Sequence, residues 1–142
     1  MDLDLTYRTE FAKTVSESDV YGFAGITGDF SPNHVNAQAM EQTSYGERLA
    51  HGVLTLGFAS TAASRFIAET GLAAVSYGYD RVRFIRPVFI GDTITITYRI
   101  CAVDRDRNEL RAEVVAVNQR DTVVMASEHI LRVIDRPKRA VA

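Results

Sequence analysis

The stretch that decides the fold runs from His51 to Gly71 and reads HGVLTLGFASTAASRFIAETG. Apolar and small residues follow one another from Val53 to Ala68 without a proline, a length that gives about five turns of helix. Because these residues are apolar around most of the helix circumference, the pattern predicts a buried helix rather than a surface one. Gly71 is a suitable terminator.

The chain that follows this helix changes to the period of β-strands. Alternating or β-branched runs predict strands over residues 75–84, 93–100, 110–117 and 123–133. Turn signals separate these runs, among them Arg86-Pro87 and Gly91-Asp92.

The chain that precedes the helix predicts one strand and two shorter helices. Residues 6–15 read as a short strand, after which Ser16 caps a helix that Gly28 ends. A loop is expected over residues 29–36, and Asn36 can cap a second short helix that breaks down near Tyr45-Gly46.

Helices followed by a run of strands indicate an α+β fold, with one domain over residues 1–142. A curved antiparallel sheet wrapped around a single long helix is the hotdog arrangement, which is the expected architecture. Because one helix covers only part of such a sheet, a homodimer is expected.

Composition and charge disfavour several classes of partner. The net charge is −2 and no basic cluster stands out, so nucleic-acid binding is disfavoured.

The acidic start Met1-Asp2-Leu3-Asp4 is unlike a signal peptide, and no apolar run approaches the ~20 residues that span a bilayer. Cys101 is the one cysteine, which favours a reducing compartment, and we expect a cytoplasmic protein. The basic tail over residues 132–139 is expected to fray.

Two motifs near the start of the long helix carry candidate chemistry. Asp29 and His34 lie five positions apart, where Gly28 and Pro32 both discourage regular helix. An acid/base pair on a loop beside a helix N-terminus is a catalytic arrangement. Taken singly, Asp29 could equally end a helix in a turn, and His34 could equally form a loop hydrogen bond.

Residues in this region resemble the hydratase signature of the MaoC-like dehydratases. The resemblance is closest to the (R)-specific enoyl-CoA hydratases, a hotdog family. The matching groups are Phe23-Ala24, Thr27-Gly28-Asp29, Pro32 with His34, and Ala50-His51-Gly52. Downstream, Arg83 to Val88 with Gly91-Asp92 resembles a strand-turn-strand element of the same proteins.

The resemblance implies roles for four residues, and two further residues at the site depart from the family pattern. Asp29 and His34 would be the catalytic pair, and the Gly52 N–H would bind the thioester carbonyl oxygen. Ser60 falls where the hydratases carry a serine that supports the site, although a helical serine often bonds back to the i−4 carbonyl instead. Ser31 and Asn33 depart from the family's usual Asn and Leu-like residues, which puts substrate preference in question.

The sequence predicts neither a metal site nor a nucleotide cofactor. His51 is expected to satisfy a loop carbonyl, and His129 is expected at the surface or an interface. Three histidines with no second carboxylate at ligand spacing disfavour a metal, and no Gly-rich loop indicates a nucleotide cofactor.

The expected function is a cofactor-free hydro-lyase. It would hydrate trans-2-enoyl-CoA to (R)-3-hydroxyacyl-CoA, or run in reverse, on acyl groups carried by CoA or by acyl carrier protein. Two alternatives remain. A hotdog thioesterase usually lacks the Asp29/His34 pair, and a non-catalytic acyl-CoA-binding or carrier-protein-binding subunit would be expected to have lost it.

Overall fold

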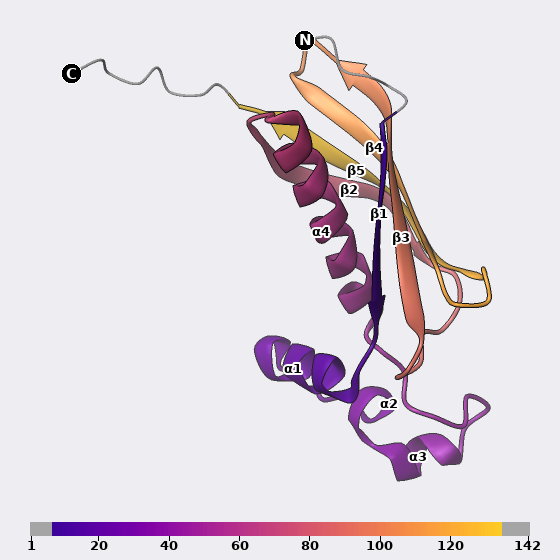
Figure 1. Ribbon diagram of the computed structural model, residues 1–142. Coiled ribbons are helices and arrows are strands. Elements are labelled where there is room, and N and C mark those ends of the chain that lie inside the picture. Colours follow the sequence, from indigo (N-terminus) through magenta and orange to yellow (C-terminus); the bar gives the residue numbers. More distant parts are fainter. Residues whose placement is uncertain (1–6, 135–142) are drawn as a thin grey trace.

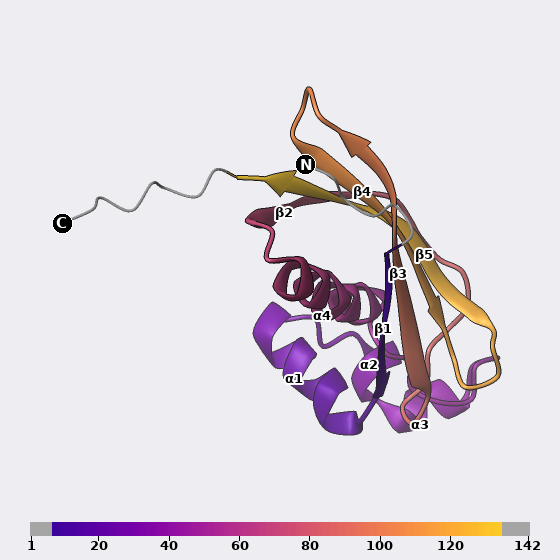
Figure 2. The same cartoon turned by 45° about the horizontal axis from the view of Figure 1, so that its top comes forward.

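The computed structural model describes residues 7–134, which form an antiparallel sheet curved around one long helix (Figures 1 and 2). The five strands are ordered β1-β3-β4-β5-β2. Their bounds are β1 Arg8–Thr14, β2 Ala74–Phe84, β3 Thr93–Asp104, β4 Glu109–Val117 and β5 Val123–Val133. This arrangement confirms the predicted α+β hotdog fold.

The long helix α4, Gly52–Thr70, lies in the concave side of the sheet (Figure 2). Gly71 ends it in the left-handed conformation, at φ 64°, as the sequence predicts. The face that packs on the sheet is fully apolar apart from one threonine, and its buried residues are Thr55, Phe58, Ala59, Ala62, Ala63 and Phe66.

The opposite face of α4 is exposed, so the expectation of an all-round buried helix is wrong for a single chain. Val53 is 56% exposed, and a Cβ added at Gly57 would meet no described atom within 4 Å. The sheet curves over one side of the helix only, so the residues on its other side stay exposed.

Three short helices lie together at the N-terminal end of α4 (Figure 1). They are α1 Glu17–Thr27, α2 Pro32–Val35 and α3 Ala37–Glu41. A capping box between Ser16 and Asp19 begins α1, and Asn36 accepts from the Ala39 N–H at 3.0 Å to begin α3.

The short helix α2 lies inside the segment expected to be a loop. Pro32 occupies its first turn, where the missing N–H has no helical partner to lose and the fixed φ suits the helix. Pro32 therefore starts this turn of helix instead of preventing it.

His129 is buried in the core, so the expectation of a surface or interface histidine is wrong. It is 1% exposed, and β5 pairs it with Ala112, which also faces the core. The Tyr98 hydroxyl lies 3.0 Å from His129 Nδ1, and the Ser76 hydroxyl lies 2.8 Å from Nε2. Burial lowers the pKa of His129 to about 4.

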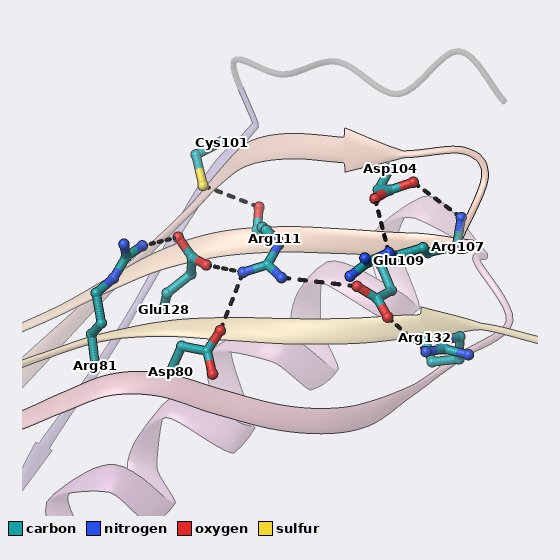
Figure 3. A network of polar contacts seen from close by, with 9 residues as sticks. All are labelled: Asp80, Arg81, Cys101, Asp104, Arg107, Glu109, Arg111, Glu128 and Arg132. Carbon is teal, nitrogen blue, oxygen red and sulfur yellow. Dashed lines mark hydrogen bonds and ion pairs between the residues drawn. The ribbon is translucent and has the colours of Figure 1, made fainter.

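The outer face of the sheet carries cross-strand ion pairs (Figure 3). Arg111 on β4 contacts Glu128 on β5 and reaches Asp80 on β2 at 3.3 Å. Arg132 pairs with the buried Glu109 at 2.6 Å.

The basic tail beyond residue 134 lies outside the described residues. Within residues 7–134, none of the helices has the length and apolar character to cross a membrane.

Candidate active site

The turn after α1 holds Asp29. Gly28 ends α1 with φ 82°, a left-handed conformation that suits glycine, and donates its N–H to the Ala24 carbonyl at 2.8 Å. The Asp29 carboxylate accepts from the Ser31 N–H at 3.2 Å, which fixes one oxygen. Its side chain remains 53% exposed, so the other oxygen is open to a ligand.

His34 lies in α2, and a hydrogen bond at its Nδ1 fixes the orientation of its ring. Nδ1 lies 2.7 Å from the Leu49 carbonyl, and because a carbonyl can only accept, Nδ1 carries the proton of the neutral ring. Nε2 is then an acceptor, and the Asn33 amide lies 3.3 Å from it. The residue is 8% exposed.

His51, the N-cap residue of α4, links the turn that holds Asp29 to the long helix. Its Nε2 donates to the Asp29 carbonyl at 3.0 Å, which confirms the expected bond to a loop carbonyl. Its ring stacks on His34, with the ring centroids 3.7 Å apart. His51 therefore fixes the backbone of one candidate catalytic residue and the ring of the other.

Asp29 and His34 meet at a distance that suits a bridging water. Asp29 Oδ2 lies 3.9 Å from His34 Nε2 and 3.9 Å from His51 Nε2. This separation exceeds a direct hydrogen bond and accommodates a water that contacts both groups.

The same three residues offer ligand atoms that lie within 4.8 Å of one another, a spacing that a metal ion could use. A ligating imidazole nitrogen must be free of its proton, whereas His51 Nε2 donates to the Asp29 carbonyl. His34 Nδ1 donates to the Leu49 carbonyl, so His34 Nε2 is the one imidazole nitrogen that is left free of a proton beside the Asp29 carboxylate. These contacts favour a water site, and the expected absence of a metal stays a prediction.

A cavity of about 320 Å³ extends from His34 along the first turn of α4. Its walls are largely apolar, and its polar side chains include Asn33, His34, Thr55 and Arg86. Gly52 lies in the wall beneath the Phe84 ring, and a Cβ added at Gly52 would lie 2.9 Å from that ring. A side chain at position 52 would therefore displace Phe84.

The sequence-predicted site residues divide into two groups. Asn33, His34 and Gly52 line the cavity. Asp29 is not part of the cavity wall, but its Oδ2 lies 3.9 Å from Nε2 of His34, which is. Ser31 is exposed and contributes its backbone N–H to Asp29 rather than its hydroxyl. Ser60 is exposed on α4 and does not line the cavity, so its supporting role stays a prediction.

Thr55 is the cavity residue that sequence reasoning missed. Its side chain is 1% exposed, and its hydroxyl has no hydrogen-bond partner among the described residues. A polar residue three positions after Gly52 in an apolar run was the available signal, since positions i and i+3 share a helix face.

Matches to known proteins cover nearly all of this chain. The family model described as "MaoC like domain" matches residues 2–125. This chain belongs to the MaoC-like domain family. The expected family is thereby confirmed.

Two relatives of this MaoC-like domain carry an activity in their names. An (R)-specific enoyl-CoA hydratase of Rhodospirillum rubrum is 40% identical over 89 residues, which cover 63% of this chain and 60% of that protein. A 3-hydroxybutyryl-CoA dehydratase of Methylorubrum extorquens is 30% identical over 141 residues, covering 99% and 85%. The expectation of a hydro-lyase agrees with both names.

A solved structure shares the architecture. The unliganded R-hydratase PhaJ1 of Pseudomonas aeruginosa superimposes with a TM-score of 0.81 at 25% identity. The match covers 99% of this MaoC-like domain and 94% of that chain. The curved sheet and its central helix are therefore common to both proteins.

Proposed function

We propose that this MaoC-like domain hydrates trans-2-enoyl-CoA to (R)-3-hydroxyacyl-CoA, or catalyses the reverse dehydration, without a cofactor. The observation that carries the proposal is the 3.9 Å approach of Asp29 Oδ2 to His34 Nε2 beside a largely apolar cavity. A carboxylate and a neutral imidazole at this spacing can activate one water for addition to a double bond. The hydratase and dehydratase names of the relatives agree with this chemistry.

The water would bind between Asp29 and His34. Its oxygen forms a bond to C3 of the enoyl group while one member of the pair accepts its proton and the other orients it. The π electrons of the double bond move onto the thioester carbonyl, and the resulting enolate takes a proton at C2. The water would replace the long Asn33 contact at Nε2. Acid–base help of this kind contributes on the order of 10² to 10⁴ in rate.

The enolate oxygen would bind at the start of α4. Gly52 is the first residue of that helix, so its N–H has no partner within the helix, and the helix dipole favours negative charge there. Loss of one fixed donor of this kind typically costs about 3 kcal/mol of transition-state stabilisation. Gly52 and His34 line the same cavity, which supports the proposal that an oxyanion site and a water site act on one substrate.

The acyl group is proposed to be carried by CoA, or by acyl carrier protein in a close variant. The same site would serve both carriers, because the reacting atoms are those of the acyl thioester. Ser31 and Asn33 flank the pair and are the residues from which an altered acyl preference is expected.

We also propose that two copies of this chain associate through β2 and the open face of α4. β2 is an edge strand in the described sheet, and its Val75 and Tyr77 side chains are 48% and 62% exposed. Residues 74–79 of this strand carry no charged side chain, and an edge strand with unpaired backbone groups favours pairing with another strand. A second copy would cover the exposed side of α4 as well.

One assay tests the proposed reaction. Crotonyl-CoA absorbance at the enoyl band is followed while a thiol reagent reports free CoA in parallel. Hydration predicts loss of enoyl absorbance without free thiol. Release of thiol would instead indicate a thioesterase, and no change in either signal would leave a binding subunit; both outcomes contradict the proposal.

A further inference from the structure

The hydroxyl of Thr55 differs from those of two other helical threonines. Thr27 donates to the Phe23 carbonyl at 2.8 Å, and Thr70 donates to the Phe66 carbonyl at 2.7 Å. Both are i−4 contacts, which is how a helical threonine usually satisfies its hydroxyl. Thr55 is more deeply buried than either, yet its Oγ1 has no partner among the described residues.

The carbonyl that Thr55 would use is already occupied. The His51 carbonyl accepts from the Leu54 N–H at 3.0 Å and from the Thr55 N–H at 3.4 Å. A carbonyl oxygen has two lone pairs, so these two donors leave no place for the Thr55 hydroxyl. The start of α4 therefore leaves a buried hydroxyl without an internal acceptor.

Thr55 lies one turn after Gly52 on α4, beside the proposed oxyanion site. Helical side chains lean toward the helix N-terminus, and positions i and i−3 share a face. Thr55 thus leans over the turn that begins with Gly52, and both residues line the same cavity. A buried polar group without a partner is costly, so a ligand that accepts its hydrogen bond is favoured.

We propose that the Thr55 hydroxyl is a second hydrogen-bond donor to the thioester carbonyl oxygen, beside the Gly52 N–H. This inference rests on the proposed hydratase function and adds a residue to the same site. Asn33 and His34 stand at the water end of the cavity, whereas Thr55 and Gly52 stand together on α4. Two donors that converge on one oxygen stabilise the enolate more than either donor alone.

The test compares two substitutions that separate the hydroxyl from the shape of the side chain. Thr55→Val removes the hydroxyl and keeps the volume, and we expect kcat to fall on the order of 10²-fold with KM nearly unchanged. Thr55→Ser keeps the hydroxyl, and we expect kcat within a few-fold of the parent. The control Thr70→Val removes a hydroxyl that is already bonded far along α4, and it should leave kcat unchanged.

The thermal stability of the variants separates a role of Thr55 in substrate binding from a purely structural role. Thr55→Val removes an unsatisfied buried hydroxyl, so its Tm should equal or exceed that of the parent while kcat falls. Thr70→Val loses a formed hydrogen bond and should have a lower Tm. Should Thr55→Val fail to fold, Thr55→Ala tests the same loss.

The carbonyl stretch of a bound substrate tests the contact directly. Carbonyl-labelled ¹³C crotonyl-CoA is bound to the Asp29→Asn protein, with and without Thr55→Val, and examined by difference infrared spectroscopy. Loss of a donor should raise the stretching frequency. Equal frequencies, parent-like kcat in Thr55→Val, or equal losses in the Val and Ser variants would each overturn the inference. If the parent protein itself shows no hydration, the proposed function fails instead.

Discussion

Asp29 and His34 are held very differently by the residues around them. His34 is almost fully buried, and its Nδ1 is fixed by the Leu49 carbonyl. Asp29 has one oxygen fixed by the Ser31 N–H, and its side chain is half exposed. The imidazole is therefore preorganised by burial, whereas the carboxylate depends on the geometry of its own turn.

That turn depends on His51, which leads to the first prediction. His51→Phe keeps an aromatic ring to stack on His34 and loses the 3.0 Å bond to the Asp29 carbonyl. Because small displacements of a catalytic group can cost roughly 10²-fold in rate, we expect kcat to fall by about that factor. The assay is crotonyl-CoA hydration, with the unfolding transition followed by circular dichroism.

His51→Gln is the matched variant, since its side-chain amide retains a donor. It should keep more activity than His51→Phe. Equal turnover in His51→Phe and the parent protein would contradict the role of His51 as a positioning residue.

Sequence motifs are most informative for residues that are identified by their type and local spacing. The sequence motifs single out Asp29, His34 and Gly52; His34 and Gly52 line one cavity, and Asp29 Oδ2 lies 3.9 Å from His34 Nε2. Which ring nitrogen of His34 donates a hydrogen bond could not be predicted, because the acceptor is the Leu49 carbonyl, fifteen residues away. The unpartnered Thr55 hydroxyl was missed because it depends on how many donors the His51 carbonyl already accepts.

At the scale of elements, β5 brings a titratable group into the core. His129 is 1% exposed between Tyr98 and Ser76, and its ring stacks on Tyr79 at 4.2 Å. Burial lowers its pKa from the ordinary 6.5 to about 4, because the charged form is desolvated. The folded protein therefore binds fewer protons than the unfolded chain between these two values.

Stability should accordingly fall as the pH is lowered. The contribution of neutral His129 is complete above pH 6.5 and is lost progressively as the pH falls toward about 4. The shift corresponds to about 3 kcal/mol of unfolding free energy over that range. Urea unfolding at a series of pH values measures it.

The control for this prediction is His129→Gln, which has no titrating group at that position. The difference between the parent and variant curves isolates His129 from the carboxylates. If both proteins lose the same stability between pH 6.5 and 4, the pKa assignment is wrong.

Periodicity predicted the strands and the ends of α4, because both are local features of the chain. The expectation of a loop fails at α2, because a proline discourages a helix in its interior but suits the first helical turn, where Pro32 lies. Periodicity also failed for the open face of α4. Which side of a helix a sheet covers is a tertiary property, and small residues such as Gly57 and Ser60 fit a buried or an exposed position equally.

At the scale of the whole molecule, the exposed edge at β2 leads to a prediction about assembly. We expect a dimer in solution by analytical ultracentrifugation. Val75→Lys places a charge on the edge strand and should shift the equilibrium toward monomer, because a charged edge opposes strand pairing.

The control is Val123→Lys, which adds the same charge at another exposed valine, at the start of β5. It should remain dimeric. A monomeric parent protein at micromolar concentration, or unchanged association of Val75→Lys, would contradict the proposed interface.

The most direct test of the account is the rate of crotonyl-CoA hydration by Asp29→Asn and His34→Ala. If the two side chains activate one water together, each substitution should lower kcat by at least about 10²-fold while the protein stays folded and dimeric. Near-normal turnover by either variant would contradict the assignment of the catalytic pair.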